Sequence, residues 1–156
     1  MTKTEKAQFD NIGLTWYPWI GKHYQTGGIY NKKILILGES HYGTEEDKWF
    51  NEDLTILSIQ QKIGEAPGEE GKFYKKAFHT NIFKAFNEKP TTTKNLIDFW
   101  HSVSFFNYVQ GSVGEKARQR PKGDDWSNSL NAVKKTFDIL KPEVIVVLGY
   151  SLWENT

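Results

Sequence analysis

The chain has 156 residues, with 20 Lys and Arg against 19 Asp and Glu, and a formal net charge of +1. This length fits a single domain, residues 1–156, whose core needs no covalent staples. The absence of cysteine excludes a disulfide scaffold, a cysteine zinc site and a thiol nucleophile, and the apolar runs fall far short of the roughly 20 residues of a membrane-spanning helix.

The N-terminal segment is polar as far as Lys6 and lacks the apolar stretch of a signal peptide. We therefore expect a cytoplasmic protein with no membrane partner. Residues 1–30 show no clear periodicity but contain the run Trp-Tyr-Pro-Trp-Ile-Gly at 16–21. Side chains of this size are not left in water, so the segment is predicted to be an ordered N-terminal arm.

Strand and helix patterns alternate after the arm. In chain order, they predict a buried strand over 33–37, helices over 45–62, 73–87 and 93–100, a second strand over 103–109, a helix over 125–140 and a third buried strand over 143–148. Thr92 or Thr93 is the expected cap of the third helix. The alternation predicts an α/β fold, a three-layer α/β/α sandwich around a mainly parallel sheet. Because a further helix pattern begins after Gly149, we expect either that a further strand of the fold follows Thr156 or that the chain is naturally short.

Ligands of parallel sheets bind beyond the carboxyl ends of the strands, which directs attention to residues 38–43, 107–110 and 149–153. In the first segment, Gly38 permits a sharp turn, Glu39 is a candidate general base, Ser40 a water-positioning hydroxyl and His41 an acid or base. Tyr42 is a candidate stacking wall. The alternative is an ordinary strand-to-helix turn, in which Ser40 or Thr44 caps the helix.

The second candidate is Asn107, at the end of an apolar strand. Its amide carries an acceptor and two donors, so it can pair with a pyrimidine edge that presents a carbonyl beside an N–H. The alternative, equally open at this point, is that Asn107 bonds only to loop backbone. The third candidate is a basic loop between aromatic residues, which suits a phosphate backbone or is simply solvated; its cations are Lys116, Arg118, Arg120 and Lys122.

The four histidines show no metal-ligand spacing, and neither a Walker A sequence nor G-x-G-x-x-G is present. We therefore expect no metal and no cofactor. His79 and His101 are predicted to be packing or surface residues.

Taken in their order along the chain, these segments resemble the motifs of the uracil-DNA glycosylase superfamily. The family's G-Q-D-P-Y-H motif is similar to Gly38-Glu39-Ser40-His41-Tyr42-Gly43, and its L-L-L-N run is similar to Ser104-Phe105-Phe106-Asn107. A helix that begins with Trp and a further apolar strand follow, at 126–140 and 144–149. The resemblance runs from about residue 33 to the end of the chain.

The resemblance implies a monomer that flips a uracil-type base out of DNA and breaks its N-glycosidic bond in base-excision repair. It implies base contacts from Gly38, Tyr42, Phe106 and Asn107. Ser40 stands at the family's water-activating Asp position, and the family's late His-containing motif has no counterpart before Thr156. The expectation is therefore that chemistry falls to Glu39, Ser40 and His41.

Two alternatives use the same segments. One is a non-catalytic nucleic-acid or nucleobase-binding module on the same fold, in which Glu39 has no required role. The other is a serine ester hydrolase, because Gly38-Glu39-Ser40 after a strand resembles the G-D-S start of the SGNH hydrolases, with Ser40 as nucleophile. The later N-D and D-x-x-H blocks of that family have no match here.

Overall fold

A four-stranded mixed sheet forms the centre of the protein. The computed structural model describes residues 6–44, 50–115 and 119–154. Strands β2, β3 and β4 are parallel, and the short β1 runs antiparallel to β3, in the spatial order β1-β3-β2-β4. Their bounds are Trp19–Ile20 for β1, Ile34–Gly38 for β2, Val103–Asn107 for β3 and Val144–Val147 for β4. The predicted α/β class with a mainly parallel sheet is confirmed.

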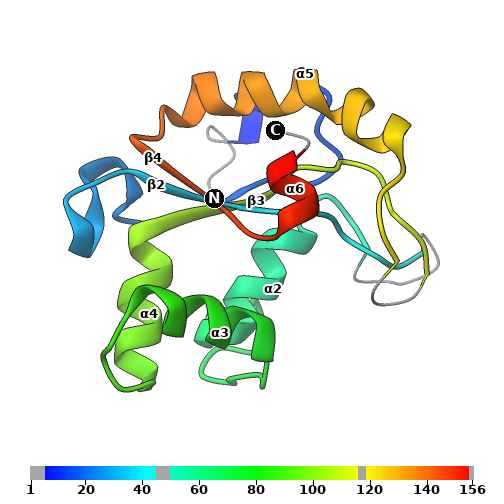
Figure 1. The fold of residues 1–156 in the computed structure, drawn as a ribbon. Coiled ribbons are helices and arrows are strands. Elements are labelled where there is room, and N and C mark those ends of the chain that lie inside the picture. Colours follow the sequence, from blue (N-terminus) through cyan, green and yellow to red (C-terminus); the bar gives the residue numbers. More distant parts are fainter. Residues whose placement is uncertain (1–5, 45–49, 116–118, 155–156) are drawn as a thin grey trace.

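Helices lie on both sides of this sheet (Figure 1). Helices α2, α3 and α4 lie on one side, and the long α5 lies on the other. Two short 3₁₀ turns, η1 and η2, precede β2. The bounds are Tyr24–Thr26 for η1, Gly28–Tyr30 for η2, Leu54–Ile63 for α2, Ala77–Phe86 for α3, Thr93–Ser102 for α4, Gly123–Leu140 for α5 and Tyr150–Glu154 for α6.

The first predicted helix, over 45–62, begins later than its pattern indicates. Residues 50–53 form a turn in which Asn51 Oδ1 accepts a hydrogen bond from the Asp53 N–H at 2.9 Å, and α2 starts only at Leu54. Phe50, expected on the helix face, packs edge-on against Trp16 with ring centroids 5.3 Å apart. Residues 45–49 lie outside the described part of the chain.

The ends of the next two helices also follow local hydrogen bonds. Helix α3 begins at Ala77 rather than at residue 73, because the Tyr74 N–H bonds across the preceding loop to the Gln61 carbonyl at 3.0 Å. The predicted cap of α4 is confirmed at Thr92, whose Oγ1 accepts from the Asn95 N–H at 3.2 Å. A short polar side chain therefore fixes this helix start, as the sequence indicated.

The N-terminal arm is ordered over its described residues, as predicted. Trp16 and Trp19 are 1% and 4% exposed. Trp19 Nε1 donates to the Trp100 carbonyl at 2.7 Å, and the Trp19 carbonyl accepts from Ser104 Oγ at 2.6 Å. These bonds dock β1 against β3, so the arm is the fourth strand of the sheet rather than a tail.

Strand β4 is less buried than its apolar sequence predicts. Val144 and Ile145 are 40% and 41% exposed. β4 pairs with β2 and lies at the end of the strand order, so its outer edge and part of both its faces remain open. The expectation of a third fully buried strand was wrong because a run that is apolar on both faces does not reveal how far from the centre of the sheet it lies.

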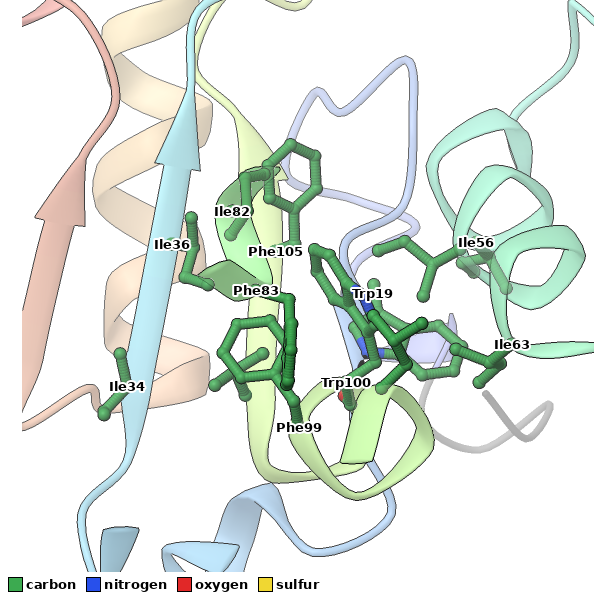
Figure 2. Close-up of a cluster of buried hydrophobic side chains, with 13 residues drawn as sticks. Trp19, Ile34, Ile36, Ile56, Ile63, Ile82, Phe83, Phe99, Trp100 and Phe105 are labelled. Atoms are coloured by element: carbon green, nitrogen blue, oxygen red, sulfur yellow. Dashed lines mark hydrogen bonds between the residues drawn. The ribbon is translucent and has the colours of Figure 1, made fainter. Parts of the chain in front are cut away.

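Two apolar cores flank the sheet because the strands alternate their side chains between its faces. The core on the side of α2, α3 and α4 is rich in aromatic rings, including Trp19, Phe99, Trp100 and Phe105, and Figure 2 shows these rings gathered beside the strands. The core under α5 contains Phe106 together with other aromatic rings, such as Tyr108 and Trp126, and aliphatic residues. Within the described ranges, no helix is both long enough and apolar enough to cross a membrane.

Replacement of Trp100 by Ala is expected to lower the free energy of unfolding by about 3–5 kcal/mol, the cost of emptying a fully buried aromatic site. Trp100 is 0% exposed, whereas Trp153 is 70% exposed. Trp153→Ala is therefore the matched control, with an expected loss below about 1 kcal/mol. Urea denaturation measures both variants, and equal losses would contradict the burial that we describe.

Candidate functional site

A cleft of about 1150 Å³ opens at the carboxyl ends of the parallel strands. The turn after β2 lines it, as do the end of β3, the segment after β4, and one face each of α2 and α3. The predicted segments 38–42 and 149–151 and residue 107 all contribute to this one cleft. The sequence prediction that the ends of separate strands meet at a shared hollow is therefore confirmed.

The turn after β2 is held in place by the chain that follows β3. The Tyr108 N–H donates to the Gly38 carbonyl and the Val109 N–H donates to the Glu39 carbonyl, both at 2.9 Å. Further on, the turn bonds to residues 112–114. The parallel pairing of β2 and β3 thus continues past both strands and fixes Glu39 beside the end of β3.

Asn107 is a deeply placed polar group of the cleft, with 6% of its surface exposed. Its side-chain amide has no hydrogen-bond partner among the residues that the structure describes. The nearby Gln110, also buried, differs: its Oε1 accepts from the backbone N–H of Thr15 and of Trp16, and its Nε2 donates to the Asn107 carbonyl. The amide lines the cleft and its atoms are not fully buried, so Asn107 is available to bond a ligand.

Gly38 makes the position of this amide possible. It is the register partner of Asn107, and a Cβ at Gly38 would overlap Asn107 Oδ1 and come within 3.0 Å of the Phe105 ring. Any side chain at position 38 would therefore displace the amide. The sequence predicted that Gly38 permits a sharp turn. In the structure, its lack of a side chain also leaves the space that the Asn107 amide occupies.

Phe106 does not line the cleft, which corrects the prediction that it contacts the base. It is 1% exposed and packs in the core under α5, on the opposite face of the sheet. Phe105 lines the cleft instead. Because side chains of a strand alternate, the face that carries Asn107 also carries residue 105, two positions earlier.

Glu39 reaches into the cleft and forms an ion pair. Arg120 Nη1 donates to Glu39 Oε1 at 2.8 Å, and the side chains are 71% and 13% exposed, respectively. Arg120 was predicted to contact a phosphate backbone. In the structure, its charge is engaged by the candidate catalytic carboxylate, so its first role is to neutralise and orient Glu39.

Of the three other predicted cations of the basic loop, the structure describes Lys122. Lys116 and Arg118 lie outside the described residues. Lys122 does not line the cleft; its backbone N–H donates to Asp125 Oδ2 at 2.7 Å, just before α5 begins. Of the four predicted phosphate contacts, the structure brings Arg120 to the cleft.

His41 is anchored rather than free in the turn. Its Nε2 lies 2.8 Å from Thr55 Oγ1 on α2, and its ring packs edge-on against Trp16 with centroids 4.9 Å apart. Burial lowers the pKa of His41 to about 4, so the imidazole is neutral at pH 7. A neutral imidazole offers one N–H and one lone pair, which suits hydrogen bonding better than proton transfer near neutrality.

Ser40 and Tyr42 also line the cleft, and Tyr42 lies at its rim with 49% of its surface exposed. A serine nucleophile requires a base within hydrogen-bond reach. In the described part of the chain, no histidine bonds to Ser40, and His41 Nε2 bonds to Thr55 instead. This arrangement gives the ester hydrolase hypothesis no support.

Sequence reasoning missed the contribution of α3. His79 was expected to be a packing or surface residue, and it is buried at 7% exposure, yet it lines the cleft together with Phe78 and Lys76. Burial, and secondarily the positive charges of Lys76 and Lys62, lower the pKa of His79 to about 3. No local signal could have revealed this position, because it depends on how α3 packs against β3.

Known proteins do not add to this description. Comparison of the chain with protein-family models, with curated proteins and with solved structures gives no match. Over the described residues, no group of three or more His, Cys, Asp or Glu side chains could hold a metal ion. The function must therefore be argued from the geometry of the cleft.

Replacement of Gly38 by Ala is expected to destabilise the fold by about 1–3 kcal/mol, because the added methyl group overlaps the Asn107 amide. Gly111→Ala is the matched control, since nothing lies within 4 Å of a Cβ built there. Chemical denaturation compares the two variants. A Gly38→Ala protein as stable as Gly111→Ala would contradict the close approach.

The pKa of His41 predicts how stability depends on pH. The imidazole binds its proton more weakly in the folded state, at about 4, than at its ordinary value of 6.5. The folded protein is therefore favoured fully above pH 6.5 and loses stability as the pH falls from 6.5 to about 4, by up to about 1.4 kcal/mol per pH unit for one histidine.

Replacement of His41 by Gln should reduce the slope by the share of one histidine, while His79, whose pKa is lowered to about 3, keeps its own share. Substitution of the exposed His23 by Gln controls for the loss of one imidazole. Urea denaturation at several pH values tests the prediction. An unchanged slope in the His41→Gln protein would show that its burial does not govern acid stability.

Proposed function

We propose that this chain is a uracil-DNA glycosylase-like domain, a three-layer α/β/α sandwich whose cleft receives a uracil-type base flipped out of DNA. The observation that carries the proposal is the meeting of the turn 38–42 with Asn107 in one cleft. These are the two segments in which the sequence resembles that superfamily. Their convergence is what a shared base pocket requires.

The recognition chemistry follows from the Asn107 amide. Its Nδ2 can donate to a ring carbonyl while its Oδ1 accepts from the neighbouring ring N–H, which is the edge that uracil presents. The cleft also offers aromatic surface, since Phe78 is 53% exposed and Tyr42 49% exposed. Stacking on such rings stabilises a planar base by about 1–3 kcal/mol, which offsets much of the cost of unstacking it.

The proposed reaction is hydrolysis of the N-glycosidic bond. As that bond breaks, positive charge develops on the sugar and negative charge on the departing base. The Glu39 carboxylate is suited to stabilise the sugar, and the hydroxyl of Ser40 can orient the attacking water. The neutral His41 ring, fixed by Thr55, adds a positioned hydrogen-bonding group beside them.

A second function, binding of a uracil-type base in DNA without hydrolysis, is favoured by one observation. Arg120 holds Glu39 at 2.8 Å, so part of the carboxylate charge is already compensated before any substrate enters. This version keeps the role of Asn107 and removes the catalytic role of Glu39. It predicts salt-dependent oligonucleotide binding with no strand scission after alkali treatment.

Uracil-containing single- and double-stranded oligonucleotides test the proposal directly. The wild-type protein is expected to release uracil, seen as alkali-labile sites, and Asn107→Ala should lower kcat/KM by about 100-fold, since an edge-bonding group is lost. Thymine-containing oligonucleotides of the same sequence are the substrate control. A wild-type protein inactive on every uracil or deaminated-base substrate would rule out the enzymatic version.

Replacement of Glu39 by Gln separates the two versions. If Glu39 stabilises the developing charge, the variant should lose about 100-fold or more in kcat while its affinity for the uracil oligonucleotide changes little. Arg120→Gln is the companion variant, because it frees the same carboxylate. The binding version predicts that the wild type and both variants bind the uracil oligonucleotide with the same affinity. It also predicts that none of the three proteins releases uracil.

A further inference from the structure

The first turn of α3 lies inside the cleft. Lys76, Ala77, Phe78 and His79 all line it, and α3 begins at Ala77. The first backbone N–H groups of a helix have no partner within the helix. No described side chain caps this end of α3, and its first turn contains no acidic residue. Unpaired N–H groups, with the positive end of the helix dipole, therefore face the cleft.

The charges around this helix start are opposite to the usual preference. Acidic residues favour a helix N-terminus and cations disfavour it, yet Lys75 and Lys76 stand immediately before α3. Lys62, from α2, is a third cation nearby and is only 9% exposed. Burial lowers the pKa of Lys62 and of Lys76. Over the described residues, neither ammonium group has an ion-pair partner.

The buried His79 leaves one polar atom without a described partner at the same helix start. It is the third residue of α3, it is 93% buried, and its Nδ1 has no hydrogen-bond partner in the described structure. Its Nε2 lies 3.5 Å from Ser58 Oγ, at the limit of a hydrogen bond. Lys76 and His79 both line the cleft at this helix start, whereas Lys62 does not line it.

We propose that the N-terminus of α3, together with Lys76, is a phosphate-binding site within the cleft. An anion with several oxygens accepts from the free N–H groups and balances the Lys76 ammonium charge. The carboxylate that the cleft does contain, Glu39, is already held by Arg120. A phosphate would thus find uncompensated positive charge at this end.

The ligand that combines this anion with the rest of the cleft is a nucleotide. Phe78, in the same helical turn, has its ring 6.0 Å from the Phe105 ring. Phe105 lies two residues before Asn107 on the same face of β3, so an aromatic wall connects the anion end to the amide. The assignment of the base to Asn107 rests on the proposed function, whereas the anion site does not.

Titration of the ¹⁵N-labelled full chain with inorganic phosphate tests the site, because it reports on each backbone amide. The amide signals of residues 77–79 are expected to shift and saturate with phosphate, and not with NaCl at the same ionic strength. Lys76→Ala should weaken the apparent affinity by about fivefold or more, the effect of one charge-assisted hydrogen bond. Lys75→Ala is the matched control, since Lys75 is exposed and does not line the cleft, and it should change affinity less than about twofold.

A folding defect in the variant is distinguishable from loss of the site. Removing a cation from a helix N-terminus favours the helix, so Lys76→Ala is expected to keep or raise the melting temperature while it loses phosphate. Amides of 77–79 that do not move in the wild type would overturn the proposal. So would a Lys75→Ala protein that loses as much affinity as Lys76→Ala.

Comparison of 2′-deoxyuridine 5′-monophosphate with 2′-deoxyuridine tests the nucleotide assignment. The monophosphate should bind more tightly than either the nucleoside or inorganic phosphate, and Asn107→Ala should weaken it without changing inorganic phosphate. If inorganic phosphate binds at 77–79 and the monophosphate binds no more tightly, the anion site is supported and the assignment of the base to Asn107 is refuted.

The source of the phosphate is resolved by competition at the same amides. A short uracil-containing single-stranded oligonucleotide that displaces inorganic phosphate from 77–79 identifies a strand phosphate as the ligand. Displacement by the mononucleotide alone identifies a free nucleotide. Both results support a nucleotide phosphate, and displacement by neither refutes it.

Discussion

The site depends above all on the parallel register of β2 against β3, which places Gly38 opposite Asn107. This pairing sets an amide against a position that has no side chain, and the amide is buried there because nothing else occupies the space. The same pairing continues beyond the strands and draws Glu39 along the end of β3. A shift of one residue in this register would turn Asn107 to the opposite face of the sheet, into the core that holds Phe106.

The charges of the cleft are divided unevenly between its two ends. At one end Glu39 and Arg120 neutralise each other, and at the α3 end Lys76 remains without an ion-pair partner in the described chain. The histidines between them contribute no charge near neutrality, since burial lowers the pKa of both His41 and His79. The cleft therefore joins a neutral, aromatic-walled surface to a positive one, which is the electrostatic pattern that a nucleotide complements.

The sequence predicted the elements better than it predicted the side chains of the site. Continuous apolar runs and the Thr92 cap located β2, β3 and α4, and the strand-end rule brought residues 38–42 and Asn107 to one cleft. The choice between Phe105 and Phe106 could not be made, because both faces of β3 are buried and an apolar run does not show which residue faces which core. The roles of His79 and Arg120 were equally hidden, since they depend on the packing of α3 and on the path of a loop, which are contacts between residues far apart in sequence.

Three departures from local preference occur within this one cleft. Asn107 carries an amide that finds no partner in the described structure, whereas the amide of the nearby Gln110 bonds through both its oxygen and its nitrogen. Lys76 places a cation at the wrong end of a helix dipole, and His79 buries a ring nitrogen without a bond. An unpartnered ring nitrogen is not special to the cleft, since Trp100 Nε1 and His101 Nδ1 also lack a partner among the described residues and do not line it. Asn107 and Lys76 are therefore the residues that indicate a ligand, because they bring to the same cleft an amide and a cation for which the described chain provides no partner.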